Sequence, residues 1–218
     1  MHRAAAKFVP RILTADQKQQ GVNFCTELRQ LASDDATFLC RVITSDKSWV
    51  YGNDPETKQQ SSQWESSTSL RPKKARQVRS NVKSMIITYF DVNGIVHKEF
   101  VPTGQTVNYG LYCDVMRPLR EHVRIRLPKL RREQKWLLHN DKDQSHTSVL
   151  TQQFLEKNKM ALILHPPYFP DLALCDFFLF PKIILKLKGR RFDTTEEIPA
   201  ESQKVLDTLT EKDFKKTF

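Results

Sequence analysis

Three aspartates lie where separate predicted elements begin or end, and together they could bind divalent metal ions. Asp46 closes a β-rich apolar run, Asp141 follows a second apolar run, and Asp176 opens a late helical pattern. Mg²⁺ and Mn²⁺ prefer carboxylate oxygens as ligands. Two such ions held close together can stabilise the attacking and leaving oxygens of a phosphate during in-line displacement. The three positions therefore predict a two-metal phosphodiester site, although 25 acidic residues offer many other trios.

Polar capping residues predict a leader helix ahead of the main domain. Thr14 and Gln17 have the spacing of a capping box, in which the side chain of each residue accepts a hydrogen bond from the backbone N–H of the other. A helical apolar stripe follows and ends before Asp34 and Asp35; it consists of Val22, Cys25, Leu28 and Ala32.

The next elements are predicted to be mostly strands. Residues 38–46 are β-rich, and 48–51 are expected to begin a second strand. Residues 53–79 are polar and too long for a tight turn, so we expect an extended functional insertion between strands. Two strands at 82–91 and 95–101 are separated by the turn sequence 91–94, which is typical of a hairpin.

Helices and short strands then alternate to the end of the chain. We expect helices over 106–126 (interrupted near Pro118), 147–158, 175–188 and 195–209, with strands at 135–139 and 160–164 and a rigid loop at 166–170. The order predicts a mixed α/β fold in which helices cover a central sheet. Open α/β sheets tend to place their sites at strand ends, which is where the aspartates are expected.

The composition restricts the classes of partner. The net charge of +10 is compatible with a nucleic-acid partner, and equally with a merely soluble basic surface. No apolar run reaches the length of a membrane span, and no secretory signal is seen, so an intracellular setting is expected. The four cysteines are scattered without a C-x-x-C pair, which argues against zinc or a disulfide framework. Each is expected to be a small buried residue.

Basic residues gather in two segments that could contact a phosphate backbone. Residues 71–83 hold several cations and no acid, a composition that favours DNA contact over a solvated loop. A second group follows Asp176 and could track a DNA strand away from the site. The predicted DNA-binding residues are Arg71, Lys73, Lys74, Arg76, Arg79, Lys83, Lys186, Lys188, Arg190 and Arg191.

The sequence surrounding the aspartates resembles the mariner family of DNA transposases, within the Tc1/mariner group. Four stretches carry the resemblance: Ile43–Tyr51, His139–His146, His165–Ala173 and Cys175–Pro181. A fifth, Arg71–Arg76, is also similar. Between Asp141 and Asp176 lie 34 residues, the interval that marks the mariner branch.

The resemblance implies an RNase H-like fold and cut-and-paste DNA transposition. Asp46, Asp141 and Asp176 are then the catalytic and metal-binding residues, using two Mg²⁺ or Mn²⁺ ions. His139 and His146 flank Asp141 and could be metal ligands or proton shuttles; we expect His139 to be a core histidine and keep His146 as an accessory candidate. The resemblance also implies a DNA partner, a homodimer in which the insertion reaches the other subunit, a nuclear location, and neither a membrane nor a small-molecule substrate.

By the same resemblance, the chain divides into a linker and leader helix (1–36), an RNase H-like domain (37–192) with an inserted loop (53–80), and a truncated C-terminal helix (193–218). The family's N-terminal helix-turn-helix units are expected to be missing, so specific recognition of transposon ends is expected to be weak or absent.

Several positions depart from the family pattern. Lys47 stands where glutamate is usual, and Phe169 where serine is common. A lysine beside a metal carboxylate adds positive charge where binding needs negative charge, unless its side chain lies on the other face of the strand. The alternative hypothesis is therefore a catalytically inactive transposon relic that binds DNA or protein.

Overall fold

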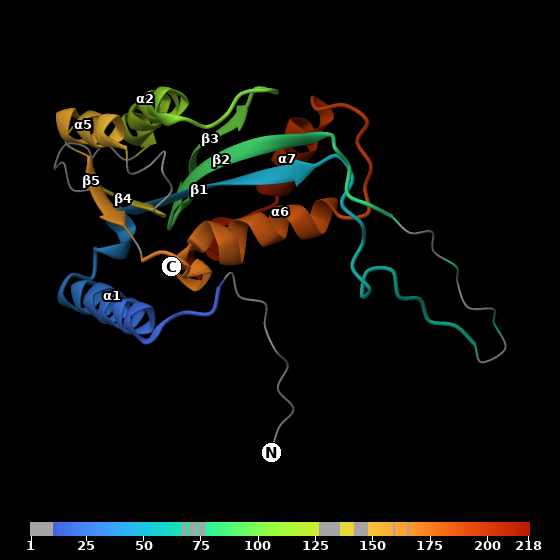
Figure 1. Ribbon diagram of the computed structural model, residues 1–218, viewed down its shortest axis with the longest axis horizontal. Coiled ribbons are helices and arrows are strands. Elements are labelled where there is room, and N and C mark those ends of the chain that lie inside the picture. The colour runs from blue at the N-terminus through green and yellow to red at the C-terminus, as the bar shows by residue number, and fades with distance from the viewer. Residues whose placement is uncertain are drawn as a thin grey trace, which may run out of the picture.

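A computed structural model describes residues 11–66, 69, 73, 77–126, 136–141, 148–158, 160–164 and 166–218. Five strands form one mixed sheet in the order β3-β2-β1-β4-β5 (Figure 1). β1 pairs antiparallel with β2, β2 pairs antiparallel with β3, and β1, β4 and β5 run parallel. The strands are β1 (Val42–Tyr51), β2 (Lys83–Asp91), β3 (Gly94–Val101), β4 (Leu137–Asn140) and β5 (Ala161–Leu164).

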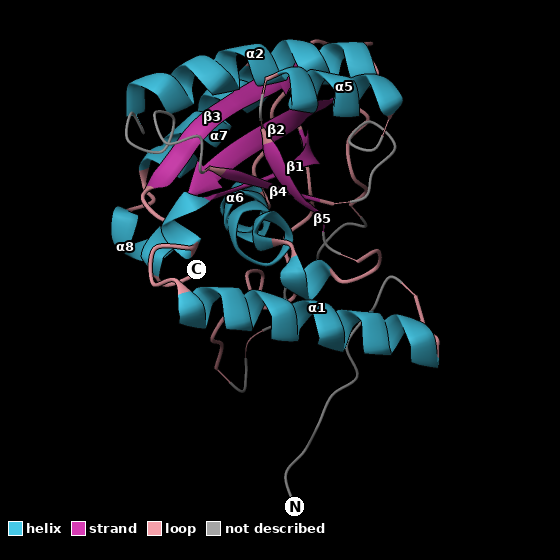
Figure 2. Cartoon of the chain, turned by 90° about the vertical axis from the view of Figure 1, so that its left-hand side faces the viewer, coloured by secondary structure: helices cyan, strands magenta, loops and turns pink. Residues whose placement is uncertain are grey.

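Helices cover both faces of this sheet, as the α/β prediction requires (Figure 2). The helices are α1 (Ala15–Asp34), α2 (Tyr109–Arg126), α5 (Val149–Lys157), α6 (Phe180–Leu187), α7 (Glu197–Asp207) and α8 (Glu211–Lys215). Short helical turns are η1 (Leu39–Arg41), η2 (Pro170–Leu172) and η3 (Cys175–Leu179), the last with π-helical hydrogen bonding.

Alternation along the strands divides the buried side chains into two cores. Ile87 and Tyr89 of β2 belong to the core beneath α2 and α5. Ile86 and Phe90 belong to the core beneath η3, α6, α7 and α8. Because successive strand residues point to opposite faces, each residue of β1 can be assigned to one of these two sides.

The leader helix α1 begins as predicted. The Thr14 hydroxyl accepts from the Gln17 N–H, and the Gln17 side chain accepts from the Thr14 N–H. Of the predicted apolar stripe, Val22 and Cys25 are exposed, whereas Leu28 and Ala32 are half-buried. Gly21 is the buried residue of α1, and the half-buried Phe24 and Leu28 follow it at helical spacing on the same face.

The first strand differs from the prediction at both ends. Residues 38–41 form a helical turn instead of strand, where the Asp35 carboxylate accepts from the Thr37 N–H and pairs with Arg41. The predicted second strand at 48–51 is a continuation of β1, because the ladder with β2 runs unbroken from Thr44 to Tyr51. Asp46 therefore lies within a strand and not at its end.

The hairpin predicted at 82–101 is confirmed. The Asp91 carboxylate accepts from the N–H groups of Asn93 (2.8 Å) and Gly94 (3.0 Å). Gly94 has φ of 141°, a conformation that side-chain-bearing residues rarely adopt. The turn residues thus determine where β2 ends and β3 begins.

The later helices agree with the prediction except in two places. α2 continues through Pro118 without interruption. Burial of Met116 and Leu119 on either side of the proline offsets the cost of roughly 3 kcal/mol for an interior proline. The predicted helix at 195–209 is α7, and the following α8 was not predicted because it is only five residues long.

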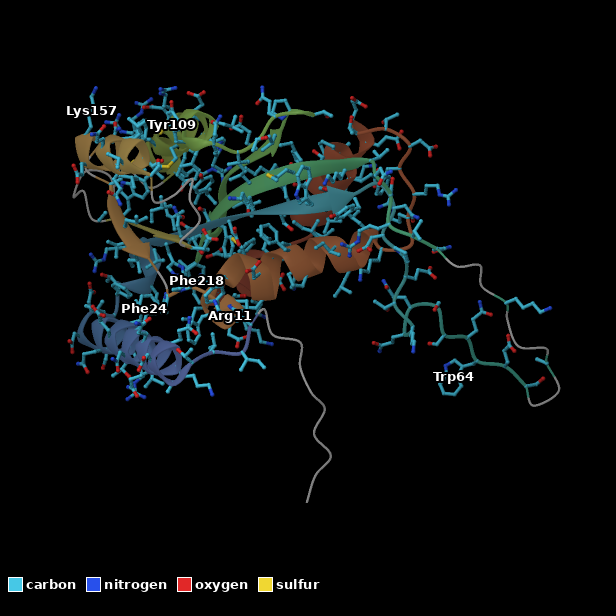
Figure 3. The ribbon with its side chains drawn as sticks, viewed as in Figure 1. Arg11, Phe24, Trp64, Tyr109, Lys157 and Phe218 are labelled. Carbon is cyan, nitrogen blue, oxygen red and sulfur yellow. The ribbon has the colours of Figure 1, made fainter. Side chains whose placement is uncertain are left out.

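The insertion between β1 and β2 projects away from the sheet, and Trp64 lies far out along it, fully exposed (Figure 3). Its base is fixed to the body of the protein. The Ser80 N–H donates to the Asn53 carbonyl (2.9 Å), and Asn53 forms a bridge with Arg191 beyond α6. Sequence alone predicted an extended insertion but not this attachment.

Two further expectations concern cysteines and membranes. All four cysteines are free, as expected, but burial was predicted wrongly for Cys25 and Cys40, which are exposed; Cys175 is buried. α1 and the turn after it leave one side open to solvent, which explains the two exposed thiols. Within the described ranges, no helix combines the length and apolar character needed to cross a bilayer.

Replacing Phe90 by alanine is expected to destabilise the fold by about 3–5 kcal/mol. Phe90 is fully buried, and its ring centroid lies 5.5 Å from Phe214 and 6.1 Å from Phe178. Thermal unfolding should show a fall in Tm of roughly 6–20 °C for a chain of this size. Phe177→Ala is the control, since that ring is about half exposed and its loss should change little. An equal effect of both changes would contradict this account of the core.

Candidate active site

The pairing of β1 with β4 brings Asp46 and Asp141 to neighbouring positions. Thr44 is opposite His139 in the parallel ladder, and the same offset continues to Ser45 and Asn140, whose side chains are hydrogen-bonded at 2.6 Å. Asp46 directly follows Ser45, and Asp141 directly follows Asn140. β4 ends at Asn140, so this is the point at which β1 loses its parallel neighbour.

Asp176 reaches the same region from η3. The preceding residue, Cys175, is buried in the core beneath α6, and its sulfur lies 3.9 Å from the Thr88 hydroxyl. Thr88 is opposite Asp46 in the ladder between β1 and β2. The burial of Cys175 therefore fixes the start of η3 beside Asp46.

Burial and the charges of neighbouring aspartates shift the pKa values of Asp46 and Asp176. Burial raises the pKa of Asp46 to about 8, and the negative charges of Asp176 and then Asp141 add to the effect. Burial and the charge of Asp141 also raise the pKa of Asp176, while a hydrogen bond with Asp46 opposes that rise. Repulsion of this kind disfavours three ionised carboxylates unless a positive charge is added.

A buried polar network, which the sequence did not reveal, supports the two strands of the site. The Ser45 hydroxyl donates to the Asn140 side-chain oxygen, and the Asn140 amide donates to the Tyr112 hydroxyl of α2 at 2.5 Å. All three residues are buried. The signal that could have indicated them is a polar residue immediately before each of two candidate carboxylates, in strands otherwise apolar.

Lys47 lies beside Asp46 in sequence but on the other face of β1. Asp46 shares its side of the strand with Val50, which packs beneath α6, whereas Lys47 shares its side with Ile43, which packs beneath α2. The Lys47 backbone N–H donates to the Asp46 carboxylate at 2.7 Å, and among the causes acting on the pKa of Asp46 the charge of Lys47 comes last. The lysine therefore offsets little of the carboxylate repulsion.

The donor chemistry of the three carboxylates fits Mg²⁺ or Mn²⁺, both of which bind through oxygen. Within the ranges described, however, no three His, Cys, Asp or Glu side chains stand close enough to enclose an ion. The carboxylates thus converge without closing into a complete ligand set.

His139 is buried, as predicted, with Nδ1 3.4 Å from the Thr44 hydroxyl.

The predicted DNA-binding residues around the base of the insertion have acidic partners. The Arg79 Nε lies 3.1 Å from one Asp54 carboxylate oxygen, and the Lys188 Nζ lies 3.8 Å from the other. Arg79 also stacks over the Tyr51 ring. The acid-free composition of 71–83 therefore overstated the local positive charge, because Asp54 supplies a counter-charge from earlier in the insertion.

The remaining predicted contacts differ in their surroundings. The Lys83 Nζ lies 4.1 Å from the centre of the Trp49 ring, and the Lys186 Nζ donates to the Thr208 hydroxyl at 2.8 Å. Arg190 pairs with Glu201, whereas Lys73 and Arg191 are exposed. Four predicted site residues lie outside the described residues: Arg71, Lys74, Arg76 and His146.

Comparison with known proteins identifies relatives. A family model described as "Transposase (partial DDE domain)" matches residues 54–133. The mariner Mos1 transposase of Drosophila mauritiana is 27% identical over 194 residues, which cover 88% of this chain and 55% of that protein. The human histone-lysine N-methyltransferase SETMAR is 26% identical over 193 residues, covering 88% of this chain but 27% of that protein. The chain thus spans about half of Mos1 and about a quarter of SETMAR.

Among solved structures, the Mos1 mariner paired-end complex with Mn superposes with a TM-score of 0.88 at 23% identity. The match covers 100% of this chain and 62% of that one. This similarity confirms the RNase H-like fold predicted from the sequence. The predicted resemblance to mariner transposases is also confirmed, by the family model and by Mos1.

Proposed function

We propose that this homologue of the mariner transposases is a metal-dependent DNA endonuclease and strand transferase. One observation supports the proposal most: Ser45 and Asn140, which precede Asp46 and Asp141, are hydrogen-bonded at 2.6 Å, and Cys175, which precedes Asp176, contacts Thr88 opposite Asp46. Isolated carboxylates at turns or helix starts would not share a site. The DDE-domain match and the similarity to Mos1 point to the same chemistry.

The three carboxylates would hold two Mg²⁺ or Mn²⁺ ions, and the related Mos1 complex contains Mn. When bound, such ions supply Lewis-acid stabilisation of the attacking and leaving oxygens of a phosphodiester. The chain's own part is to position the carboxylates. The buried network of Ser45, Asn140 and Tyr112 holds β1 and β4 in register, and the buried Cys175 holds the start of η3.

The proposed partner is DNA, because the related Mos1 assembly is a paired-end complex and this chain carries a net charge of +10. The projecting insertion would reach a second subunit in a homodimer, and its exposed Trp64 is compatible with such a contact. We further propose a nuclear location, where a DNA substrate would be met. Cleavage of DNA by the purified chain in the presence of Mn²⁺ tests the function directly.

Replacing Arg191 by alanine is expected to weaken DNA binding equally for all sequences and to reduce the salt slope of binding by about 1. Arg191 is exposed, and among the described residues no acidic partner is found for it. The neighbouring Arg190 is the matched control, since Glu201 already neutralises it, and Arg190→Ala should change the slope less. Fluorescence anisotropy across a salt series measures both slopes. Equal slopes for wild type and Arg191→Ala would contradict the assignment.

A second candidate function is a catalytically inactive module that binds DNA or protein. One observation favours it: the human relative that shares this region has a name that describes a different activity. Calorimetric titration with Mn²⁺ discriminates the two functions. An inactive module should bind DNA while showing no heat of metal binding that depends on Asp46.

A further inference from the structure

The loop that leads to Asp176 rests on the N-terminal helix α1. A Cβ atom built on Gly21 would lie 2.4 Å from both Cε1 and Cζ of Phe169, far inside van der Waals contact. The Phe169 ring therefore occupies the space that a side chain at position 21 would take. Gly21 is the buried residue of α1, so this contact lies on the face of the helix that packs against the domain.

The same loop has a backbone conformation that needs external support. Tyr168 has φ of 71°, in a region that residues with side chains rarely adopt. Such conformations persist where surrounding contacts impose them. Two contacts with the N-terminal segment supply this support. The Arg11 guanidinium lies 5.4 Å from the centre of the Tyr168 ring, and the ring of the next residue, Phe169, packs against Gly21.

Backbone hydrogen bonds connect Phe169 to Asp176 without a gap. The Leu172 N–H donates to the Phe169 carbonyl at 3.0 Å, and the Ala173 N–H donates to the Pro170 carbonyl at 3.1 Å. The Asp176 N–H then donates to the Ala173 carbonyl at 2.9 Å. These overlapping turns link the backbone of Phe169 to the start of η3.

We propose that Gly21 and Phe169 are positioning residues whose contact sets where the loop presents Asp176 to Asp46 and Asp141. The role of the three carboxylates in this inference rests on the proposed function. The contact between Gly21 and Phe169 does not depend on it. The Phe169 ring fills the space beside Gly21, so an aromatic contact couples α1 to the candidate site.

A double-mutant cycle tests the proposal, with Gly21→Ala, Phe169→Ala and the combined variant of the full chain. Mn²⁺ affinity measured by calorimetry is the first readout. Each single change is expected to weaken Mn²⁺ binding about three- to tenfold, and the combined change by no more than Phe169→Ala alone, because contacting residues are not additive. Val22→Ala is the control, since Val22 is the exposed neighbour of Gly21 in the same helix and should leave the affinity unchanged.

Thermal unfolding separates positioning from a loss of fold. Alanine is a better helix former than glycine, so Gly21→Ala should raise Tm if only helix propensity matters. A lower Tm for Gly21→Ala that reverts in the Phe169→Ala background identifies the clash between the two residues. Weaker Mn²⁺ binding at unchanged Tm supports positioning more strongly still.

Amide hydrogen exchange of residues 172–176 supplies a readout that needs no metal. Faster exchange there in both single variants, with β2 and α2 unaffected, supports the positioning role even if the wild type binds no Mn²⁺; in that event only the proposed function fails. Exchange rates and Mn²⁺ affinities equal to those of the wild type in both single variants would overturn the proposal.

Discussion

Asp141→Asn is expected to reduce Mn²⁺-dependent DNA cleavage by about a thousandfold or more. Metal-ion stabilisation of developing charge is worth several kcal/mol, and each 1.36 kcal/mol corresponds to a tenfold change in rate. Asp141 is the carboxylate whose charge acts on both Asp46 and Asp176, so the change removes a shared part of the proposed ligand set. Conversion of supercoiled plasmid to nicked and linear forms measures the rate.

The control for this experiment is Asp193→Asn, which makes the same chemical change at an exposed position beyond α6. It should leave cleavage within a factor of about two, since surface substitutions away from special features have small effects. Circular dichroism of both variants checks that the fold is retained. Cleavage by Asp141→Asn at the wild-type rate would rule out the proposed site.

The parts of the fold that sequence predicted well are those determined by local chemistry. The capping box of Thr14 and Gln17 begins a helix wherever it occurs, and Asp91 with Gly94 forms a turn from four consecutive residues. These features need no information about distant parts of the chain. Their outcomes agree with the prediction to within a few residues.

The errors arose where tertiary pairing decides the outcome. Asp46 was expected at a strand end, but pairing with β2 carries β1 five residues further, and the relevant end belongs to β4. The convergence of the carboxylates depends on the register of Ser45 with Asn140, which links residues 95 positions apart. No local pattern encodes that register. The acidic partner of Arg79 was missed for the same reason, since Asp54 is distant in sequence and close in space.

The metal-free protein is expected to become more stable when Asp46 is replaced by asparagine. The pKa of Asp46 is raised from 3.8 to about 8, so between those values the folded state holds a proton that the unfolded chain has lost. The contribution of Asp46 to wild-type stability therefore falls as the pH rises from about 4 to about 8. Asp46→Asn removes this dependence, and at pH 8 the gain should be about 3 kcal/mol or more, at ~1.36 kcal/mol per unit of pKa.

Urea unfolding of wild type and Asp46→Asn at pH 4 and pH 8, in the presence of a chelator, measures the effect. The two proteins should be nearly equal at pH 4 and differ most at pH 8, while Asp193→Asn should follow the wild type throughout. Mn²⁺ should reverse the order at pH 8, because a ligand that binds only the folded state adds RT ln(1 + [L]/Kd) to its stability. A wild type that remains the less stable of the two in saturating Mn²⁺ would show that Asp46 no longer serves a metal. The buried, mutually repelling carboxylates would then be a remnant of an earlier catalytic site, and the inactive module would be the better description of this chain.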